Sequence, residues 1–165
     1  MGSSDIIAII SVALSAVAAG FSLWSFFLER NRNRSESTIH AFDALQEKAF
    51  GRDEVSINSI SADKAKLIVH NYITYTHDET YKKQWRDLTK NLALLEHFAV
   101  GVNLKTYDLK TLNAMAGNMM IEMWNSLTPI IEYKRSKQNG KKNYYEFQKM
   151  VEDIIQYRRR KGEGC

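Results

Sequence analysis

An uninterrupted run of uncharged residues, 6–28, constrains this chain more than any other feature of its sequence. The run contains 23 residues, and a helix of that length measures about 34 Å at a rise of about 1.5 Å per residue. The hydrocarbon core of a bilayer is about 30 Å thick, so such a helix can cross it. No other stretch of the sequence is comparably long and apolar. We therefore expect residues 1–34 to form a transmembrane anchor with a basic exit.

The charges that flank the run predict its orientation. Only Asp5 and the amino terminus precede it, whereas Arg30, Arg32 and Arg34 follow it. Arginines close to a membrane end favour the cytoplasmic side and attract anionic lipid headgroups. We expect the amino terminus to lie outside a bacterial inner membrane and residues 35–161 to form a cytoplasmic domain. The alternative is a cleaved signal peptide, but that requires a positive n-region, and this one is acidic.

Small residues recur on two roughly opposite faces of the predicted anchor. One face carries, at spacings of 4, 3, 4 and 3 residues, Ser11, Ser15, Ala18, Ser22 and Ser25. The other carries Ala16 and Gly20, a small-xxx-small pair. Small residues let membrane helices approach closely, and serines can hydrogen-bond across the contact for about 0.6 kcal/mol each. These seven residues form a predicted oligomerisation seam. The alternative is an isolated helix in which each serine bonds the carbonyl four residues before it.

Charge and cysteine content restrict the compartment and the partners. The net charge is +4, and part of the excess lies in the basic run of residues 158–161. That run could bind phospholipid or nucleic acid, but short terminal basic runs are usually only solvated, so we do not expect nucleic acid as a partner. Cys165 is the only cysteine, which excludes an internal disulfide and fits a reducing compartment. Residues 162–165 are expected to form a disordered tail.

The remainder of the sequence predicts an all-α helical bundle. It contains a single proline, and its apolar residues recur at helical spacing. The anchor helix could continue through residues 33–50, and a second helix begins after Ser61, which fits an N-cap. The third helix, over residues 79–100, carries the clearest buried stripe, at Tyr81, Trp85, Leu88, Leu92, Leu95 and Ala99.

Two further helices complete the predicted bundle, which is long enough to enclose one core. Asp108 is expected to cap the fourth helix, whose apolar positions are Leu109, Leu112, Met115, Met119, Met123 and Leu127. Thr128 and Pro129 fit an N-cap followed by proline at the first helical position, which predicts a kink or a restart there. Gly117 is a second position at which this long helix could be interrupted. The last helix is predicted over residues 144–159.

Glu96 is the polar residue most in need of a partner. It lies within the apolar residues 92–100, and a carboxylate partly removed from water requires a partner or a proton. The candidate partners are Arg135 and the backbone N–H groups of the helix that Asp108 begins. We therefore expect Glu96, Asp108 and Arg135 to be structural polar residues. The alternative is a catalytic carboxylate.

Other motifs do not add up to a catalytic or metal site. The four histidines, at positions 40, 70, 77 and 97, lack a metal-ligand spacing. There is no phosphate-binding glycine loop and no nucleophile elbow. Arg34 and His40 resemble the Arg–His element of helical ribonucleases, but arginines at a membrane exit already have a topological role. We predict no cofactor, no metal and no catalytic residue.

A series of weak motifs in one order covers about half of the chain, from residue 91 onward. The motifs are Asn91 with Glu96, Gly101, Tyr107-Asp108, Trp124, Ile131 with Arg135, and Tyr145-Glu146-Phe147. In this order they resemble a bacterial family known only as a domain of unknown function. The resemblance implies an N-terminal membrane helix and a small all-helical cytoplasmic domain. It implies no accepted reaction.

The architecture favours one functional hypothesis and leaves two alternatives. We expect a self-associating interaction or effector protein of the bacterial inner membrane, because small proteins of this shape resemble stress and phage-defence effectors. One alternative is a non-enzymatic membrane tether that docks a cytoplasmic protein partner. The other, less favoured, is a helical nuclease-like enzyme that uses Glu96, His97 or the pair Arg34 and His40.

Overall fold

The computed structural model describes residues 3–50, 57, 60–137 and 140–162, with side chains described from residue 14 onward. Within these residues all regular structure is helical, and there is no strand. The prediction of an all-α fold is therefore confirmed. The helices, in chain order, are α1 (Ser3–Ala49), α2 (Ala62–Thr74), α3 (Glu79–Asn103), α4 (Leu109–Ser136) and α5 (Tyr145–Lys161).

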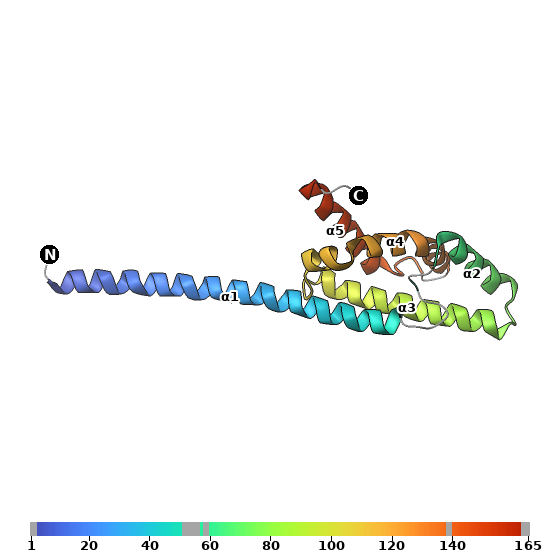
Figure 1. The fold of residues 1–165 in the computed structure, drawn as a ribbon, viewed down its shortest axis with the longest axis horizontal. Coiled ribbons are helices and arrows are strands. Elements are labelled where there is room, and N and C mark those ends of the chain that lie inside the picture. Colours follow the sequence, from blue (N-terminus) through green and yellow to red (C-terminus); the bar gives the residue numbers. More distant parts are fainter. Residues whose placement is uncertain (1–2, 51–56, 58–59, 138–139, 163–165) are drawn as a thin grey trace.

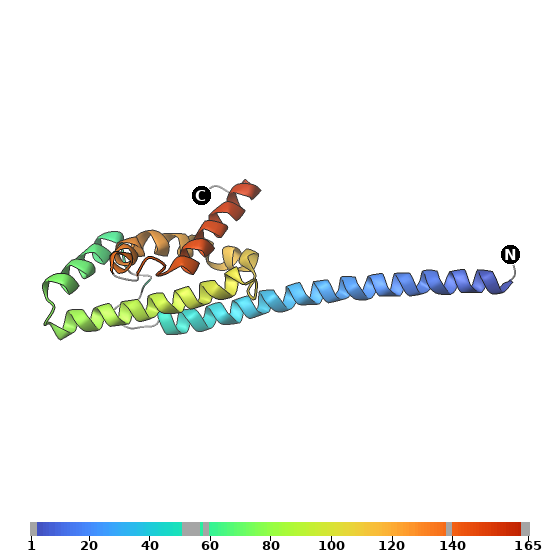
Figure 2. The same cartoon turned by 180° about the vertical axis from the view of Figure 1, so that it is seen from behind.

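The longest element, α1, is a single helix that projects far from the bundle (Figures 1 and 2). It contains 47 residues, which corresponds to a length of about 70 Å. Its carboxyl-terminal part lies beside α3, where Phe42, Leu45 and Ala49 are buried in the core. The predicted continuation of the anchor helix through residues 33–50 is thus confirmed to within one residue.

The apolar run of residues 6–28 is only partly covered by the described side chains, because those of residues 6–13 lie outside them. From residue 14 onward, no helix contains an apolar stretch long enough to cross a membrane. In the described part of the run, the large apolar side chains are exposed, with Phe21 at 71% and Trp24 at 65%.

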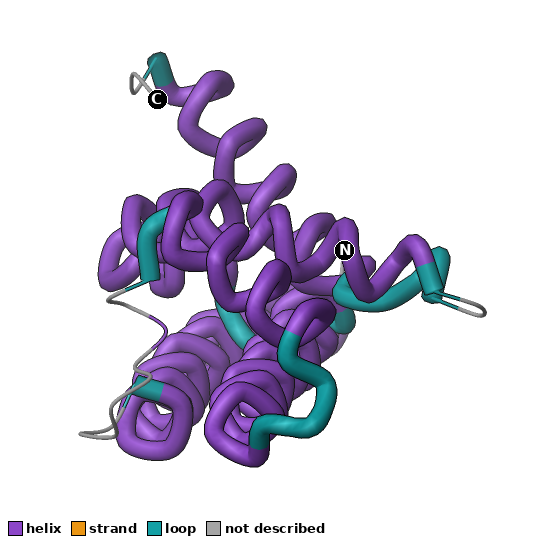
Figure 3. The backbone as a smooth tube through the Cα atoms, turned by 90° about the vertical axis from the view of Figure 1, so that its right-hand side faces the viewer, coloured by secondary structure: helices purple, strands orange, loops and turns teal. Residues whose placement is uncertain are grey.

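The bundle consists of two layers around one apolar core (Figure 3). α1 and α3 lie side by side in one layer, and α2, α4 and α5 pack over them. α3 contacts α1, α2 and α5, so it connects both layers. The side chains with no exposed surface at the centre include Leu88, Leu92, Leu95, Leu112, Leu127, Phe147 and Ile154.

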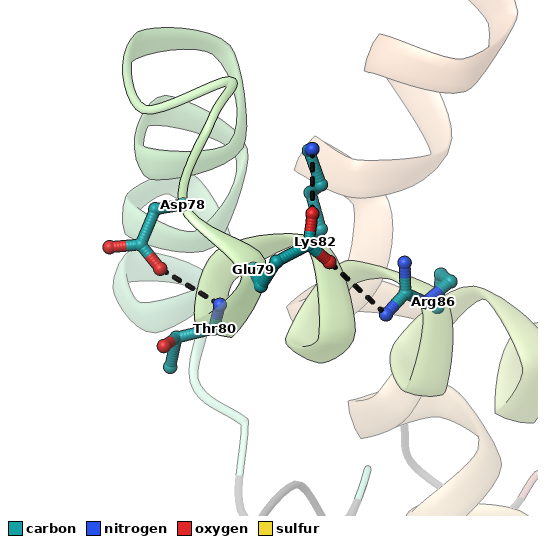
Figure 4. A network of polar contacts seen from close by, with 5 residues as sticks. All are labelled: Asp78, Glu79, Thr80, Lys82 and Arg86. Carbon is teal, nitrogen blue, oxygen red and sulfur yellow. Dashed lines mark hydrogen bonds and ion pairs between the residues drawn. The ribbon is translucent and has the colours of Figure 1, made fainter.

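Local caps explain where α2 and α3 begin. Ser61 Oγ accepts a hydrogen bond from the Lys64 N–H (3.2 Å), so the predicted N-cap of α2 is confirmed. Asp78 caps α3 by accepting from the Thr80 N–H (2.8 Å) (Figure 4). Glu79, in the first turn of α3, contacts Lys82 (2.8 Å) and Arg86 (3.8 Å). The hydrogen bond from Lys82 lowers the pKa of the Glu79 carboxyl, but an exposed pair of this kind adds little stability.

α4 does not restart at Pro129, so the predicted N-cap at Thr128 and the restart, one of the two predicted outcomes, are wrong. The helix runs through Pro129 to Ser136, and Thr128 donates its hydroxyl to the Trp124 carbonyl inside the helix (2.8 Å) instead of capping a new one. Leu127 and Ile130, on either side of the proline, are both fully buried. Because α4 is packed into the core before and after Pro129, tertiary contacts outweigh the lost backbone hydrogen bond.

Two further details of α4 differ from the sequence prediction. Met115 is 41% exposed, while Ala116 and Met120 are buried, so the buried face is shifted by one residue in this part of the helix. Gly117 does not interrupt the helix. A Cβ at Gly117 would overlap the side-chain ends of Arg158 and Asn113, so the glycine leaves room for the hydrogen bond that Arg158 of α5 donates to Asn113 Oδ1 (2.6 Å).

Truncation of Phe42 tests whether α1 is part of the folded core. Phe42 is 3% exposed and packs near Phe98 of α3 (ring centroids 6.0 Å apart). Phe42→Ala should lower the free energy of unfolding by about 3–5 kcal/mol, measured by chemical denaturation of the full chain in detergent. Ile39→Ala, at a position 39% exposed on the same helix, is the matched control and should cost far less. Equal losses would show that α1 does not belong to the core.

Candidate functional site at the junction of α1 and α4

α1 is attached to the start of α4 by a polar junction made of Arg34, Ser35, Thr38, Asp108 and Thr111. Thr38 is its centre and is the only buried polar side chain among the residues that the structure describes. Its hydroxyl donates to the Arg34 carbonyl one turn earlier in α1 (2.6 Å) and accepts from the Asp108 N–H at the start of α4 (2.7 Å). The Thr38 hydroxyl therefore joins the backbones of two helices.

Asp108 caps α4 and extends the junction. Its carboxylate accepts from both the N–H and the hydroxyl of Thr111, each at 2.8 Å, which confirms the predicted cap. Thr111 Oγ1 lies 2.7 Å from Ser35 Oγ of α1. Because the single hydroxyl proton of Thr111 is committed to the carboxylate, Ser35 must be the donor in that contact. A second hydrogen-bonded chain thus runs from α1 to the α4 cap.

Arg34, one of the three arginines predicted to face lipid, lies against the connection between α3 and α4. Its Nη2 donates to the Tyr107 carbonyl (3.1 Å), and its Nε is buried with no hydrogen-bond partner among the described residues. Arg30 and Arg32 are exposed, and Arg32 pairs with Glu36 on α1 (3.6 Å). Among the described residues, Arg34 is thus the one of these three arginines with a hydrogen bond to the bundle.

The α3–α4 connection is itself anchored by aromatic packing. The Tyr107 ring stacks on Phe98 of α3 (5.3 Å between centroids), and Phe98 in turn contacts Phe42 of α1. Gly101 is required beneath this ring, because a Cβ there would overlap Tyr107. Lys105 turns the chain with a φ of 60°. Arg34 therefore contacts the connection directly, whereas Phe42, two turns later on α1, is linked to it through Phe98 of α3.

Glu96 caps a different helix from the one expected. Its carboxylate accepts from the N–H groups of Glu146 (3.1 Å) and Phe147 (2.8 Å) at the start of α5. Arg135, its predicted partner, instead donates to the carbonyls of Asn143 (2.9 Å) and Tyr144 (3.4 Å). Both predicted partners are wrong, although Glu96 and Arg135 do hold the same α4–α5 connection.

The missing cap of α5 explains the role of Glu96. Tyr144, at the N-cap position, has a left-handed conformation and makes no side-chain cap hydrogen bond. The first N–H groups of α5 therefore need an acceptor from elsewhere, and α3 supplies it. Burial, together with the nearby Glu96 carboxylate, raises the pKa of the Tyr144 hydroxyl. The sequence feature that points to the Glu96 contact is the start of α5, which has no Ser, Thr or Asp at its N-cap position and so needs an acceptor from another helix.

The remaining candidate residues are not assembled into a reactive arrangement. Both oxygens of Glu96 accept backbone hydrogen bonds, and its neighbour His97 is exposed. Arg34 faces the α3–α4 connection, whereas His40 is exposed. Within the described part of the chain, no group of three or more His, Cys, Asp or Glu side chains could hold a metal ion.

The residues of the oligomerisation seam whose side chains the structure describes, from Ser15 to Ser25, are all exposed. Ser22 donates its hydroxyl to the Ala18 carbonyl (2.9 Å), which is the local bond expected of a serine in an isolated helix. A Cβ at Gly20 would meet no atom within 4 Å. The side chain of Ser11 lies outside the described residues.

Comparison with known proteins gives one match. A family model described as a domain of unknown function, DUF4760, matches residues 9–154. This range includes most of the predicted anchor as well as the bundle. Neither the curated proteins nor the solved structures contain a match.

Removal of the Thr38 hydroxyl tests the polar junction. Thr38→Val keeps the shape but leaves the Asp108 N–H without its acceptor, which should cost about 1–3 kcal/mol of stability. Hydrogen exchange of the Asp108 amide should become faster in this variant. Thr38→Ser, which keeps the hydroxyl, should leave that amide protected. Equal protection in both variants would show that the hydroxyl does not hold α1 to α4.

Glu96→Gln tests the cap of α5. An amide side chain offers a single acceptor oxygen, so one of the two α5 N–H groups loses its partner, at a cost of about 1–3 kcal/mol. The melting temperature should fall by several degrees. Glu122→Gln makes the same change at an exposed position of α4 and should have little effect. Unchanged stability combined with a lost cellular phenotype would instead favour a catalytic role for Glu96.

Proposed function

We propose that this chain, which belongs to the DUF4760 family of unknown function, is a membrane-anchored effector. It self-associates in a bacterial inner membrane. In this proposal the cytoplasmic bundle senses a signal, for example in stress or phage defence, and the anchor responds. The observation that carries the proposal is the continuity of α1, which runs without a break from Ser3 to Ala49. One helix therefore belongs both to the apolar segment and to the folded core.

Anchoring in a membrane is supported by the distribution of apolar and charged residues along α1. Residues 6–28 contain no charge. In the described part of that run, the large apolar side chains from Leu14 to Leu28 are all more than half exposed. Soluble proteins rarely expose apolar patches larger than a few hundred Å², and larger ones mark interaction or membrane surfaces. The exposed Arg30 and Arg32 follow directly, which favours a cytoplasmic bundle.

The polar junction gives the bundle a means to act on the anchor. Ser35 and Thr38 contact α4, and Arg34 contacts the α3–α4 connection. These contacts restrain rotation of α1 about its axis relative to the bundle. A ligand or partner that moved the α3–α4 connection would rotate or release α1, and an unbroken helix would carry that change to the anchor.

Self-association is supported by the small residues of the oligomerisation seam. Because the Ser22 hydroxyl already bonds the Ala18 carbonyl, we assign the contact between helices to close packing of small side chains more than to hydrogen bonds from this serine. Close packing at Ala16 and Gly20 would provide a second contact on the other face. Two such faces allow a ring, whereas one allows only a dimer.

The paired change of Ser15 and Ser22 tests packing at the seam. Replacing both with Leu keeps the segment apolar but fills the face of close approach, so crosslinked oligomers in membranes should disappear. Replacing both with Ala keeps the side chains small and should weaken the oligomers only slightly. Induced expression of the unmodified chain should depolarise or arrest cells, and the Leu pair should abolish that effect.

Two results would contradict the proposal. Identical crosslinked sizes for the Leu pair, the Ala pair and Gly20→Ile would show that the anchor is only a tether. Normal growth and normal membrane potential at high expression, with oligomers intact, would remove the effector activity. In either case the tether that docks a soluble partner becomes the better description.

A further inference from the structure

A pocket of about 290 Å³ lies between α1 and the α3–α4 connection. Six of its lining residues come from one face of α1, at spacings of three or four residues along the helix, namely Phe26, Glu29, Arg30, Asn33, Arg34 and Ser37. Thr106 of the connection contributes to the other side. The pocket therefore lies mainly on α1 and is completed by the bundle only at Thr106.

The lining of this pocket changes from apolar to cationic to polar along α1. Phe26 comes first, the charged residues Glu29, Arg30 and Arg34 follow with Asn33 among them, and Ser37 is last. If residues 6–28 cross the hydrocarbon core, Arg30 and Arg34 lie about 3 Å and 9 Å beyond its edge. The headgroup layer on each side of a bilayer is about 5–8 Å thick. The backbone of Arg30 thus lies within the headgroup layer and that of Arg34 just beyond it, and because helical side chains tilt toward the helix N-terminus, the Arg34 side chain leans back toward the lipid phosphates.

The arginines in the pocket retain hydrogen-bonding capacity. Arg34 is held in place by its bond to the Tyr107 carbonyl, yet its buried Nε–H has no acceptor among the described residues. Arg30 is exposed. The guanidinium group is planar and suits two-point binding of phosphate oxygens. With Glu29 as the one acid in the lining, the pocket carries a net charge of about +1, which matches a single phosphodiester.

We propose that this pocket binds the headgroup of one phospholipid per chain, with the phosphate between Arg30 and Arg34. The inference rests on the proposed membrane anchor and extends it from diffuse charge attraction to a defined site. Phe26 contacts the apolar part of the lipid, and Thr106 borders the headgroup from the side of the connection. The Glu29 carboxylate accepts from a headgroup hydroxyl or ammonium. Such a lipid bridges α1 and the α3–α4 connection beside the polar junction.

Native mass spectrometry of the full chain in detergent, with phosphatidylglycerol added, tests this site. Arg30→Gln removes a charge that lines the pocket. Arg32→Gln is the matched control, because Arg32 is equally close to the membrane but does not line the pocket and pairs with Glu36. The unmodified chain and Arg32→Gln should each retain one lipid with similar affinity. Arg30→Gln should lower the affinity for this lipid by at least about fivefold.

Other outcomes overturn the inference. Equal effects of the two variants, or no effect of either, would show that only diffuse charge attracts lipid. Displacement of the lipid by millimolar inorganic phosphate would identify a site for a soluble phosphate instead. Both variants should have the melting temperature of the unmodified chain, so that a loss of binding is not a loss of folding. Flotation of the unmodified chain with liposomes tests the anchor separately, and its failure would overturn the proposed function whatever the two arginine variants show.

Discussion

The buried hydroxyl of Thr38 determines how the long helix is joined to the rest of the molecule. It bonds one backbone group in α1 and one at the start of α4, and it is shielded from water. A buried N–H without an acceptor costs about 1–3 kcal/mol, so any rotation or sliding of α1 that removes Thr38 from Asp108 is opposed. Around this contact are arranged the Asp108 cap, the Ser35–Thr111 bond and the position of Arg34. α1 is thereby docked in one orientation, although apolar packing at Phe42 and Leu45 supplies most of the attraction.

Features that depend on a few neighbouring residues could be predicted from the sequence. The ranges of α3 and α5 differ from the predicted ones by at most three residues at either end. The caps at Ser61 and Asp108 are where their residue types indicated, because a cap is made by a side chain and an N–H two or three residues away. The stripe of Trp85, Leu88, Leu92 and Leu95 is buried as its spacing required.

Features that depend on contacts between distant residues could not be predicted in this way. Pro129 and Gly117 both weaken a helix in isolation, yet α4 continues through them; its neighbours bury both sides of the proline, and the Arg158 side chain of α5 lies over the glycine. Glu96 required a partner, but the choice of α5 depended on how α3 packs against it. The burial of Thr38 could not be predicted, because a threonine among polar residues is usually expected to lie on the exposed surface.

The unbroken α1 also acts as a spacer of set length. Phe42, the first buried apolar residue of α1 in the bundle, follows Leu28 by 14 positions, which is about 21 Å of helix. α3 runs antiparallel to α1, so the α3–α4 connection points back toward the N-terminal end of α1, and the turn between α2 and α3 lies at the opposite end of the molecule (Figure 1). In the proposed orientation, lipids reach the first end and cytoplasmic macromolecules the second. In that proposal, the fixed orientation of one helix assigns the two ends of a small bundle to different environments.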